Sequence, residues 1–450
     1  MWTALSVATS LAVLAASVIV GADTGWLVAL GDIVLGTGHV PAGLPFAVAD
    51  TSGWPPVPAL GGVVLALVDR LGPLGLPAAQ LTAAVVLLSL LAVAARRLGA
   101  TDGAAAAVVA LVALGAFPAL MVVRAQLLSF VPFALLLLIL RAESRRPSRR
   151  VWWLAPLVGV WGNLHGTVLL GVAVGGCYLL VGRLRRDPWT AAGVLAAMLV
   201  ALLLNPAGPR TPAYYFGVFA NETARQHILL WAPLRLSAPF DLLLVGTTLL
   251  LLGLAVCSRR PVWEYVAVAG LVVSAASAAR NGIWLSMFAV APAAAGLTTL
   301  ARRRSGARSD SRPAGPLRAV ALVSTFAMVC LSAALLVLRY PAFAADVANA
   351  RTIARLAAGR TVMAPEPLAE SLAADGARVW IADPLDAFSA TDQDAYLAFL
   401  AGHGRQADRA LDAADLVVVV HGSPAAALAR ERGFTPMTTV AGYDLVVRSH

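Results

Sequence analysis

Long apolar runs recur along this chain, and several reach the roughly 20 residues that an α-helix needs to cross a bilayer. Residues 77–95 and 318–338 are clear examples. The chain is 59% hydrophobic and 13% charged, whereas an average soluble domain is about 45–50% apolar and about 25% charged. Too few charges remain to cover the surface of a soluble protein of 450 residues. The sequence therefore predicts an all-α polytopic membrane protein.

Eleven segments are expected to span the membrane. They are residues 3–20, 77–95, 103–122, 127–141, 151–163, 166–182, 189–204, 238–257, 262–279, 283–300 and 318–338. The fifth and sixth are short and meet at Asn163-Leu-His165-Gly166, so residues 151–182 cross either twice or once as a broken helix. Residues 58–70 are too short to span and are expected to form an interfacial helix.

The loops between these segments alternate in charge. Arginine clusters fill one set, namely Arg96-Arg97, Arg141 to Arg150, Arg183 to Arg186, Arg259-Arg260 and Arg302 to Arg318. In the other set, residues 21–57 contain three aspartates and no Arg or Lys. Because basic loops stay in the cytoplasm, we expect a plasma-membrane protein with the N-terminus inside and the first loop, 21–76, outside. Two crossings within 151–182 preserve this alternation. The net charge of +10 then reflects topology and does not indicate nucleic-acid binding.

The composition changes near the C-terminus. Residues 301–317 are basic and polar and are expected to form a cytoplasmic linker at the end of a transmembrane domain over 1–340. From residue 341 to 450, apolar runs shrink to strand length, at 377–382, 416–420 and 444–447, with candidate helices at 395–401 and 424–432. This alternation predicts a small extracytoplasmic α/β domain.

Polar side chains gather on the side expected to face outward. They are Asp23, Asp32, His39, Arg124, Gln126, Asn163, His165, Asn205, Arg210, Glu222, Arg225, His227, Arg280 and Asn281. The interiors of the spanning segments carry almost no charge. Because polar groups at membrane depth are costly, this asymmetry predicts a polar cavity near the outer interface rather than a charged relay across the bilayer.

Each of the charged candidates has a functional and a structural interpretation. Asp23, directly after the first span, is placed to act as a general base or metal ligand, or it simply ends the helix and faces water. Arg124 and Arg280 lie at outer helix ends, where a guanidinium suits a phosphate or snorkels to the interface. His165 lies at a helix break, where it donates to a phosphate, ligates a metal or has a purely structural role.

Short motifs occur along the chain in a distinctive order. They are Asp23-Thr-Gly-Trp26, Gly31-Asp-Ile-Val-Leu35, Gly38-His-Val-Pro41, Trp54, Arg124-Ala-Gln126-Leu-Leu-Ser129, Trp161-Gly-Asn163-Leu-His165-Gly166, Asn205-Pro-Ala-Gly208, Ile228-Leu-Leu-Trp231-Ala-Pro233, Ala279-Arg280-Asn281, Val379 to Asp383, and Tyr396. Together they resemble the C superfamily of integral membrane glycosyltransferases, in an uncharacterised bacterial branch. The chain departs from relatives at Thr24, where many have Glu, and at Leu230, where an acidic residue is expected.

This resemblance implies a sugar transfer from a polyprenyl-phosphate carrier to a glycan or protein acceptor at the extracytoplasmic face, with inversion. Asp23 is the implied base, with Asp32 as the alternative, and Arg124, His165 and Arg280 bind the leaving phosphate. The supporting residues are Gln126, Asn163, Asn205, Asn281 and Trp54. The motifs require no metal or other cofactor, and whether the protein binds a divalent cation is left open by the sequence.

Two other functions remain open at this stage. A transporter or flippase for a lipid-linked sugar predicts polar residues at the membrane midplane and internal repeats, and neither is visible. A non-catalytic cell-envelope scaffold fits the absence of Glu at position 24.

Overall fold

The computed structural model describes residues 1–227, 231–304 and 315–448. The chain divides into two compact units, which we describe separately. Unit 1 comprises Met1–Ile19, Pro77–Leu204 and His227–Arg339, and unit 2 comprises Val20–Leu76, Asn205–Gln226 and Tyr340–His450. The expected motif residues Ile228 to Leu230, including the departure at Leu230, and residues 305–314 of the basic linker lie outside the described ranges.

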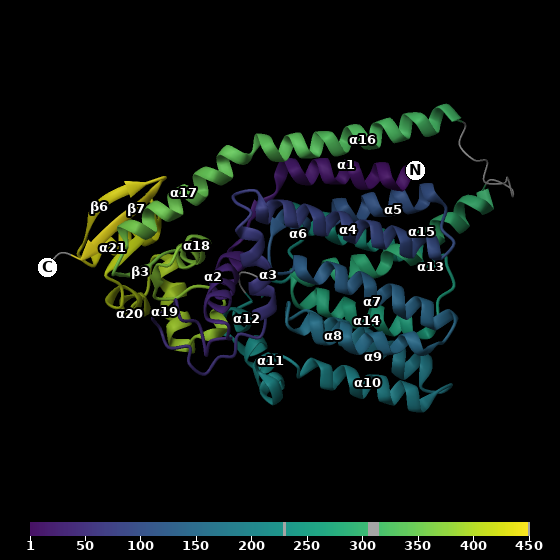
Figure 1. Cartoon of the computed structure of the whole chain (residues 1–450), viewed down its shortest axis with the longest axis horizontal. Coiled ribbons are helices and arrows are strands. Elements are labelled where there is room, and N and C mark those ends of the chain that lie inside the picture. The colour runs from purple at the N-terminus through teal and green to yellow at the C-terminus, as the bar shows by residue number, and fades with distance from the viewer. Residues whose placement is uncertain (228–230, 305–314, 449–450) are drawn as a thin grey trace. The chain divides into compact units, whose positions relative to one another are not determined.

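Unit 1 is a helical bundle (Figure 1). Its α-helices are α1 (Trp2–Ser17), α4 (Gly75–Arg97), α5 (Asp102–Gly115), α6 (Phe117–Met121), α7 (Leu127–Arg145), α8 (Leu154–Gly162), α9 (Val168–Cys177), α10 (Pro188–Leu202), α13 (Pro239–Val256), α14 (Val262–Ser277), α15 (Gly282–Arg304) and α16 (Gly315–Leu338). The turns η1 (Arg149–Trp153) and η5 (Ala279–Asn281) precede α8 and α15, and the π-helix η2 (Tyr178–Arg183) extends α9. Short strands β1 (Ile19–Val20) and β2 (Val122–Val123) complete the described elements.

A helix lies in each of the eleven segments expected to span the membrane, so the prediction of a helical membrane protein is confirmed. Within the described residues, five helical segments are long and apolar enough to cross a bilayer, namely Gly75–Arg97, Leu127–Arg145, Pro239–Val256, Ala279–Arg304 (η5 with α15) and Gly315–Leu356 (α16 continuing into Tyr340–Leu356). Shorter apolar helices fill the other ranges, so the total of eleven crossings stays a prediction. Residues 151–182 form two helices, α8 and α9, with a turn over residues 163–167 between them.

Aromatic side chains form the centre of unit 1. Phe133 on α7 packs edge-on against Trp284 on α15, with ring centroids 5.1 Å apart, and against Trp161 on α8 at 6.3 Å. Such pairs contribute roughly 0.5–1.5 kcal/mol each beyond their buried area. Gly296 lets α15 approach α13, because a Cβ atom there would collide with the carbonyl oxygen of Leu254. Close packing through small residues is the usual way for helices to associate in a bilayer.

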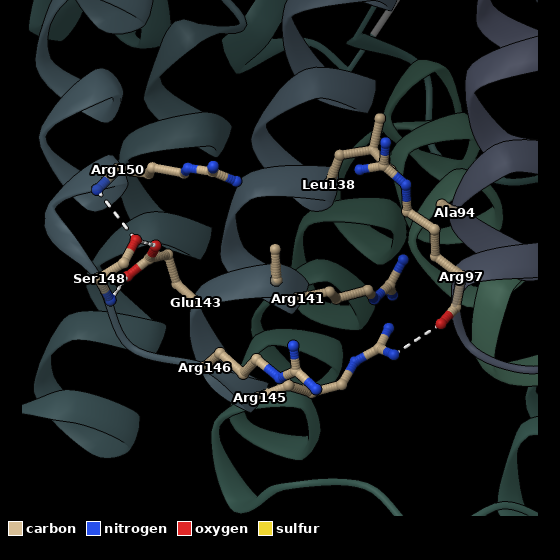
Figure 2. Close-up of a pocket in the computed structure, with 10 residues that line it drawn as sticks. Ala94, Arg97, Leu138, Arg141, Glu143, Arg145, Arg146, Ser148 and Arg150 are labelled. Carbon is tan, nitrogen blue, oxygen red and sulfur yellow. Dashed lines mark hydrogen bonds between the residues drawn. The ribbon is translucent and has the colours of Figure 1, made fainter.

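Buried ion pairs hold the arginine-bearing end of the bundle together. Arg141 on α7 pairs with Glu264 on α14 at 3.3 Å, and Arg183 pairs with Glu143 at 2.8 Å, with all four side chains almost fully buried. Arg145 Nη1 also donates to the carbonyl oxygen of Arg97 at 2.6 Å (Figure 2). The ends of α4 and α7 are therefore fastened to each other through their arginines.

Unit 2 contains a five-stranded sheet with the order β4-β3-β5-β7-β6. Its strands are β3 (Thr361–Met363), β4 (Arg378–Val379), β5 (Leu416–Val420), β6 (Phe434–Val440) and β7 (Tyr443–Arg448), and its helices are α2 (Ala22–Thr37), α3 (Ala59–Asp69), α11 (Thr211–Ala220), α12 (Glu222–Arg225), α17 (Tyr340–Leu356), α18 (Leu368–Ala374), α19 (Ala390–Ala401), α20 (Gln406–Asp412) and α21 (Pro424–Glu431). The turns η3 (Gly208–Arg210) and η6 (Leu385–Ala387) are also present. β4, β3 and β5 run parallel, whereas β7 is antiparallel to both β5 and β6. The expected α/β domain is therefore confirmed, with β3 and β6 in addition to the strands predicted.

The expected first loop is an integral part of unit 2. It contains α2 and α3, and its residues 46–49 run beside β4 at the edge of the sheet. Val48 N–H donates to the carbonyl oxygen of Val379 at 2.8 Å, and Val379 N–H donates to that of Phe46 at 3.1 Å. The sequence predicts 21–76 as a loop of the transmembrane domain and 341–450 as a separate domain, whereas their contacts group them together with residues 205–226.

Candidate active site

The candidate residues divide between the two units. Unit 1 contains Arg124, Gln126, Asn163, His165, Arg280 and Asn281, and unit 2 contains Asp23, Asp32, Trp54 and Asn205. Within unit 1, the charges of Arg124 and Arg280 both act on His165. The three residues proposed to bind phosphate therefore lie near one another, although they are far apart in the sequence.

A hydrogen-bond network joins two of the sequence motifs. Trp161 Nε1 donates to Ser129 Oγ at 2.8 Å, and Thr167 Oγ1 donates to the same oxygen at 2.6 Å. Ser129 Oγ also lies 3.2 Å from His165 Nδ1, and Thr167 Oγ1 lies 2.9 Å from the same nitrogen. The backbone N–H of Thr167 also donates to Nδ1, at 3.3 Å. Nδ1 is therefore an acceptor, which assigns the proton of the neutral ring to Nε2.

The surroundings of His165 keep it neutral. Burial in the turn between α8 and α9, together with the positive charges of Arg280 and Arg124, lowers the pKa of His165 from 6.5 to about 3. All hydrogen bonds of its ring within the described ranges involve Nδ1. Nε2–H is thus a neutral donor beside two cationic side chains, an arrangement suited to an anionic oxygen.

Arg280 is held in place by an aromatic ring. Its guanidinium lies over the ring of Trp231, with Cζ 4.0 Å from the ring centroid. The backbone N–H of Ala279 donates to the carbonyl oxygen of Ala232 at 3.0 Å, which fastens η5 to the segment that carries Trp231. Stacking restrains the arginine without neutralising its charge.

The amide side chains among the candidates mainly organise the backbone. Asn163 Nδ2 donates to the carbonyl oxygens of Gly159 and Leu204, and Asn281 Nδ2 donates to that of Ser274. Asn205 Oδ1 accepts the N–H of Ala207 in a turn. Gln126 directly precedes α7. These contacts explain why amides occupy the motif positions beside the charged residues.

In unit 2, Asp23 lies half-buried in the first turn of α2, where the helix dipole favours a carboxylate. The next turn packs very closely against α18, since a Cβ atom on Gly25 would lie 2.7 Å from the carbonyl carbon of Glu370. Only glycine allows this approach. Asp32, farther along α2, pairs with Arg70 at 2.7 Å in an exposed ion pair.

Trp54 belongs to an aromatic cluster in unit 2. Its ring lies 6.1 Å from that of Trp26 and 5.9 Å from that of Tyr214. Its Nε1 donates to Asp386 Oδ2 at 2.8 Å. Trp54 therefore links the first loop to the segment after β4, so it has a packing role in unit 2.

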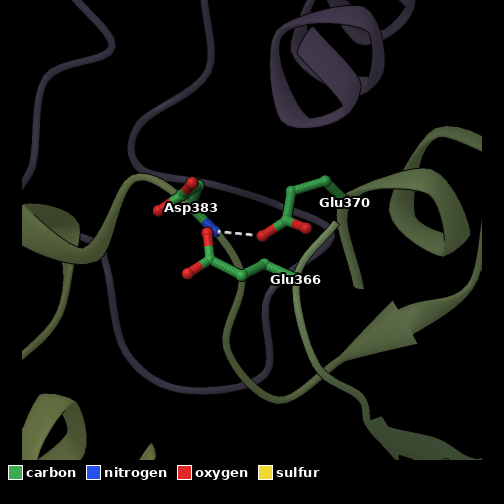
Figure 3. Close-up of side chains that lie close together, drawn as sticks. All are labelled: Glu366, Glu370 and Asp383. Carbon is green, nitrogen blue, oxygen red and sulfur yellow. Dashed lines mark hydrogen bonds between the residues drawn. The ribbon is translucent and has the colours of Figure 1, made fainter. Parts of the chain in front are cut away.

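Sequence reasoning missed a cluster of three carboxylates in unit 2. Glu366, Glu370 and Asp383 each place an oxygen within 4.8 Å of the others (Figure 3). The backbone N–H of Asp383 donates to Glu370 Oε1 at 2.8 Å, while Glu370 Oε2 is buried without a hydrogen-bond partner in the described structure. The only signal was the spacing of Glu366 and Glu370 by four residues.

The three carboxylates repel one another when all are ionised, because they lie close together and Glu370 is buried. Burial, followed by the charges of Glu366 and Asp23, raises the pKa of Glu370 from 4.5 to about 8. Burial and the charge of Glu370 also raise the pKa of Asp383 well above its usual value. Either protons or a hard divalent cation with oxygen ligands can relieve this repulsion. Glu366, Glu370 and Asp383 are thus the residues able to hold a metal.

The raised pKa of Glu370 predicts how stability depends on pH. The unfolded chain loses this proton near pH 4.5, whereas the folded chain retains it up to about pH 8, so the folded state loses stability as the pH rises through that interval. Glu370→Gln should remove this contribution, which is on the order of 2–4 kcal/mol. We expect the melting temperature of the variant to fall less between pH 5 and about pH 9.

Thermal melting of the purified full chain, followed by tryptophan fluorescence at several pH values, checks this expectation. Glu431→Gln, which removes an exposed carboxylate from the end of α21, is the matched control and should melt with the wild-type pH dependence. Equal pH dependence in the wild type and Glu370→Gln would contradict the assignment.

No family model and no curated protein matches the chain. Two solved structures match it over 99% of its length with a TM-score of 0.53 and 15% identity. They are ArnT from Cupriavidus metallidurans bound to undecaprenyl phosphate and the same protein in the apo state, covered over 97% and 96% of their lengths. The chain therefore shares its overall fold with ArnT.

Proposed function

We propose that this protein transfers a sugar from a polyprenyl-phosphate carrier to an acceptor hydroxyl at the extracytoplasmic face of the plasma membrane, with inversion at the sugar carbon. The observation that carries the proposal is the grouping of Arg124, His165 and Arg280, in which a neutral imidazole donor lies beside two cations. The likeness in fold to a protein solved with undecaprenyl phosphate supports the same donor class.

The leaving group explains why such a site accelerates transfer. In the donor, the phosphate links the sugar to the polyprenyl chain and carries one negative charge. Cleavage of the bond between the sugar carbon and oxygen leaves a phosphate monoester that gains a second charge. Arg280, Arg124 and the Nε2–H of His165 stabilise the charge that develops, so their interaction is stronger in the transition state than with the bound donor.

Asp23 is the proposed base. Its carboxylate accepts the proton of the acceptor hydroxyl as that oxygen attacks the sugar carbon, from the side opposite the phosphate. Asp32 is the alternative base, and its carboxylate pairs with Arg70 at 2.7 Å. A single displacement of this kind inverts the configuration.

The carrier also requires an apolar surface for its isoprenoid tail. Unit 1 has an apolar groove of about 380 Å³ between α5 and α13, lined by Leu111, Leu242, Leu243 and Leu250 among others. Its lining is compatible with a hydrocarbon chain, and we propose it as part of the path of the tail.

A turnover assay tests the proposed function. The purified full chain is incubated with a panel of undecaprenyl-phosphate-linked sugars and with cell-envelope acceptors, and released undecaprenyl phosphate is measured by mass spectrometry. We expect release only when both donor and acceptor are present. Movement of the donor across proteoliposomes without any release would indicate a flippase, and activity in neither assay would leave a scaffold as the better account.

A further inference from the structure

A second cavity in unit 1 is lined by arginine rather than by the candidate active-site residues. It has a volume of about 530 Å³ and lies where α4 and α7 end and η1 begins (Figure 2). Arg97, Arg141, Arg145, Arg146 and Arg150 line it, together with Glu143. Topology alone explains exposed arginines, such as Arg185 and Arg259, but does not require that they gather around one cavity. Five arginines around one cavity need a further explanation.

The charge of this cavity is largely uncompensated. Glu143 is committed to Arg183, which pairs with it at 2.8 Å, and to Ser148, whose backbone N–H donates to it at 2.8 Å. Glu264 pairs with Arg141 from α14. Among the described residues, no carboxylate pairs with Arg97, Arg145, Arg146 or Arg150. The cavity therefore concentrates positive charge that lacks a counterion within unit 1.

Arg141 is the one buried arginine among the five that line the cavity. Only 3% of its side chain is exposed. Nε donates to Glu264 and Nη2 donates to the carbonyl oxygen of Phe288 at 2.7 Å, but Nη1 is buried without a hydrogen-bond partner in the described structure. Because Nη1 is closed to solvent, the charge offered to an anionic group comes from the other four arginines, which are exposed.

We propose that this cavity binds the phosphate-bearing headgroup of an anionic membrane lipid. Guanidinium forks match phosphate oxygens in pairs, and basic pockets between helix ends on the cytoplasmic side suit anionic headgroups. Ala94 and Leu138 supply apolar wall beside the arginines, as the glycerol and acyl region of a lipid requires. The site is separate in its residues from the proposed transfer site, and binding here does not depend on whether transfer occurs.

Lipid retention by the purified full chain tests the proposal. Native mass spectrometry compares phosphatidylglycerol with phosphatidylcholine of identical acyl chains. The wild type should retain the anionic lipid preferentially. Arg146→Gln combined with Arg150→Gln should weaken that retention by roughly tenfold or more. Both side chains are exposed and unpaired in the described structure, so the double variant should keep the melting temperature of the wild type without lipid.

Two controls decide between specific and general electrostatic binding. Arg185→Gln combined with Arg259→Gln removes the same charge from exposed positions outside the cavity and should leave retention unchanged. Equal losses in the two double variants would overturn the proposal, as would equal retention of the two lipids by the wild type. Inorganic pyrophosphate is the soluble probe. Protection from thermal unfolding by pyrophosphate but not by phosphatidylglycerol would reject the lipid assignment, whereas competition between them would support phosphate recognition by the cavity.

Discussion

Asp23→Asn is expected to lower the rate of sugar transfer by roughly two to four orders of magnitude, the range typical of a lost general base. Asparagine keeps the size and polarity of the side chain in the first turn of α2 but does not accept the acceptor proton. The initial rate of undecaprenyl phosphate release at saturating donor measures this loss. The affinity for the donor should change little, because the carboxylate acts on the acceptor.

The matched control is Asp32→Asn on the same helix. This change removes the exposed ion pair with Arg70, and an exposed pair contributes about 0–1 kcal/mol. Transfer by Asp32→Asn should therefore remain close to the wild-type rate. If Asp32→Asn abolished transfer while Asp23→Asn did not, the roles of the two aspartates would have to be exchanged.

Arg280→Gln is expected to lower kcat by about 10²–10³-fold, as the loss of a preorganised group facing developing charge does in other enzymes. The stacked position over Trp231 means that little rearrangement is needed for the guanidinium to act. Because the charge on the phosphate grows only as the bond breaks, kcat should fall more than KM rises. Rate measurements over a range of donor concentrations separate the two parameters.

Arg210→Gln provides the control for Arg280→Gln. Arg210 lies in η3 of unit 2, is exposed, and carries the same charge on the side of the chain expected to face outward. Its replacement should leave kcat within about twofold. Arg280→Lys should recover part of the rate, since the charge is kept while the planar stacking and the paired donors are lost. A fall in kcat as large for Arg210→Gln would show that general surface charge, rather than this group, is responsible.

Much of the bundle could be predicted because bilayer-length apolar runs specify helices almost by themselves. The motif residues were also found, since a polar residue next to such a run is conspicuous. The network around His165 was not predictable, because the tautomer depends on how Trp161, Thr167 and Ser129 meet in three dimensions. Sequence spacing says nothing about which of these side chains donates.

The carboxylates of unit 2 escaped prediction for a different reason. Glu370 lies in an apolar stretch, Leu368 to Ala374, and reads as the exposed position of a short helix. Its burial follows from the approach of Gly25, whose place against α18 depends on a contact between segments more than 300 residues apart. Glu366 and Asp383 meet it only because β3 and β4 pair in parallel. Local patterns carry no information about such long-range pairing.

The pairing of residues 46–49 with β4 has a consequence for biogenesis. Residues 46–49 are synthesised hundreds of residues before β4. They therefore remain unpaired while the intervening helices are inserted into the bilayer. Until residues 46–49 pair with β4, the backbone N–H and C=O groups at this edge can form hydrogen bonds with neighbouring chains. The region 341–450 secreted alone should therefore aggregate more readily than when residues 20–76 are supplied as a separate polypeptide.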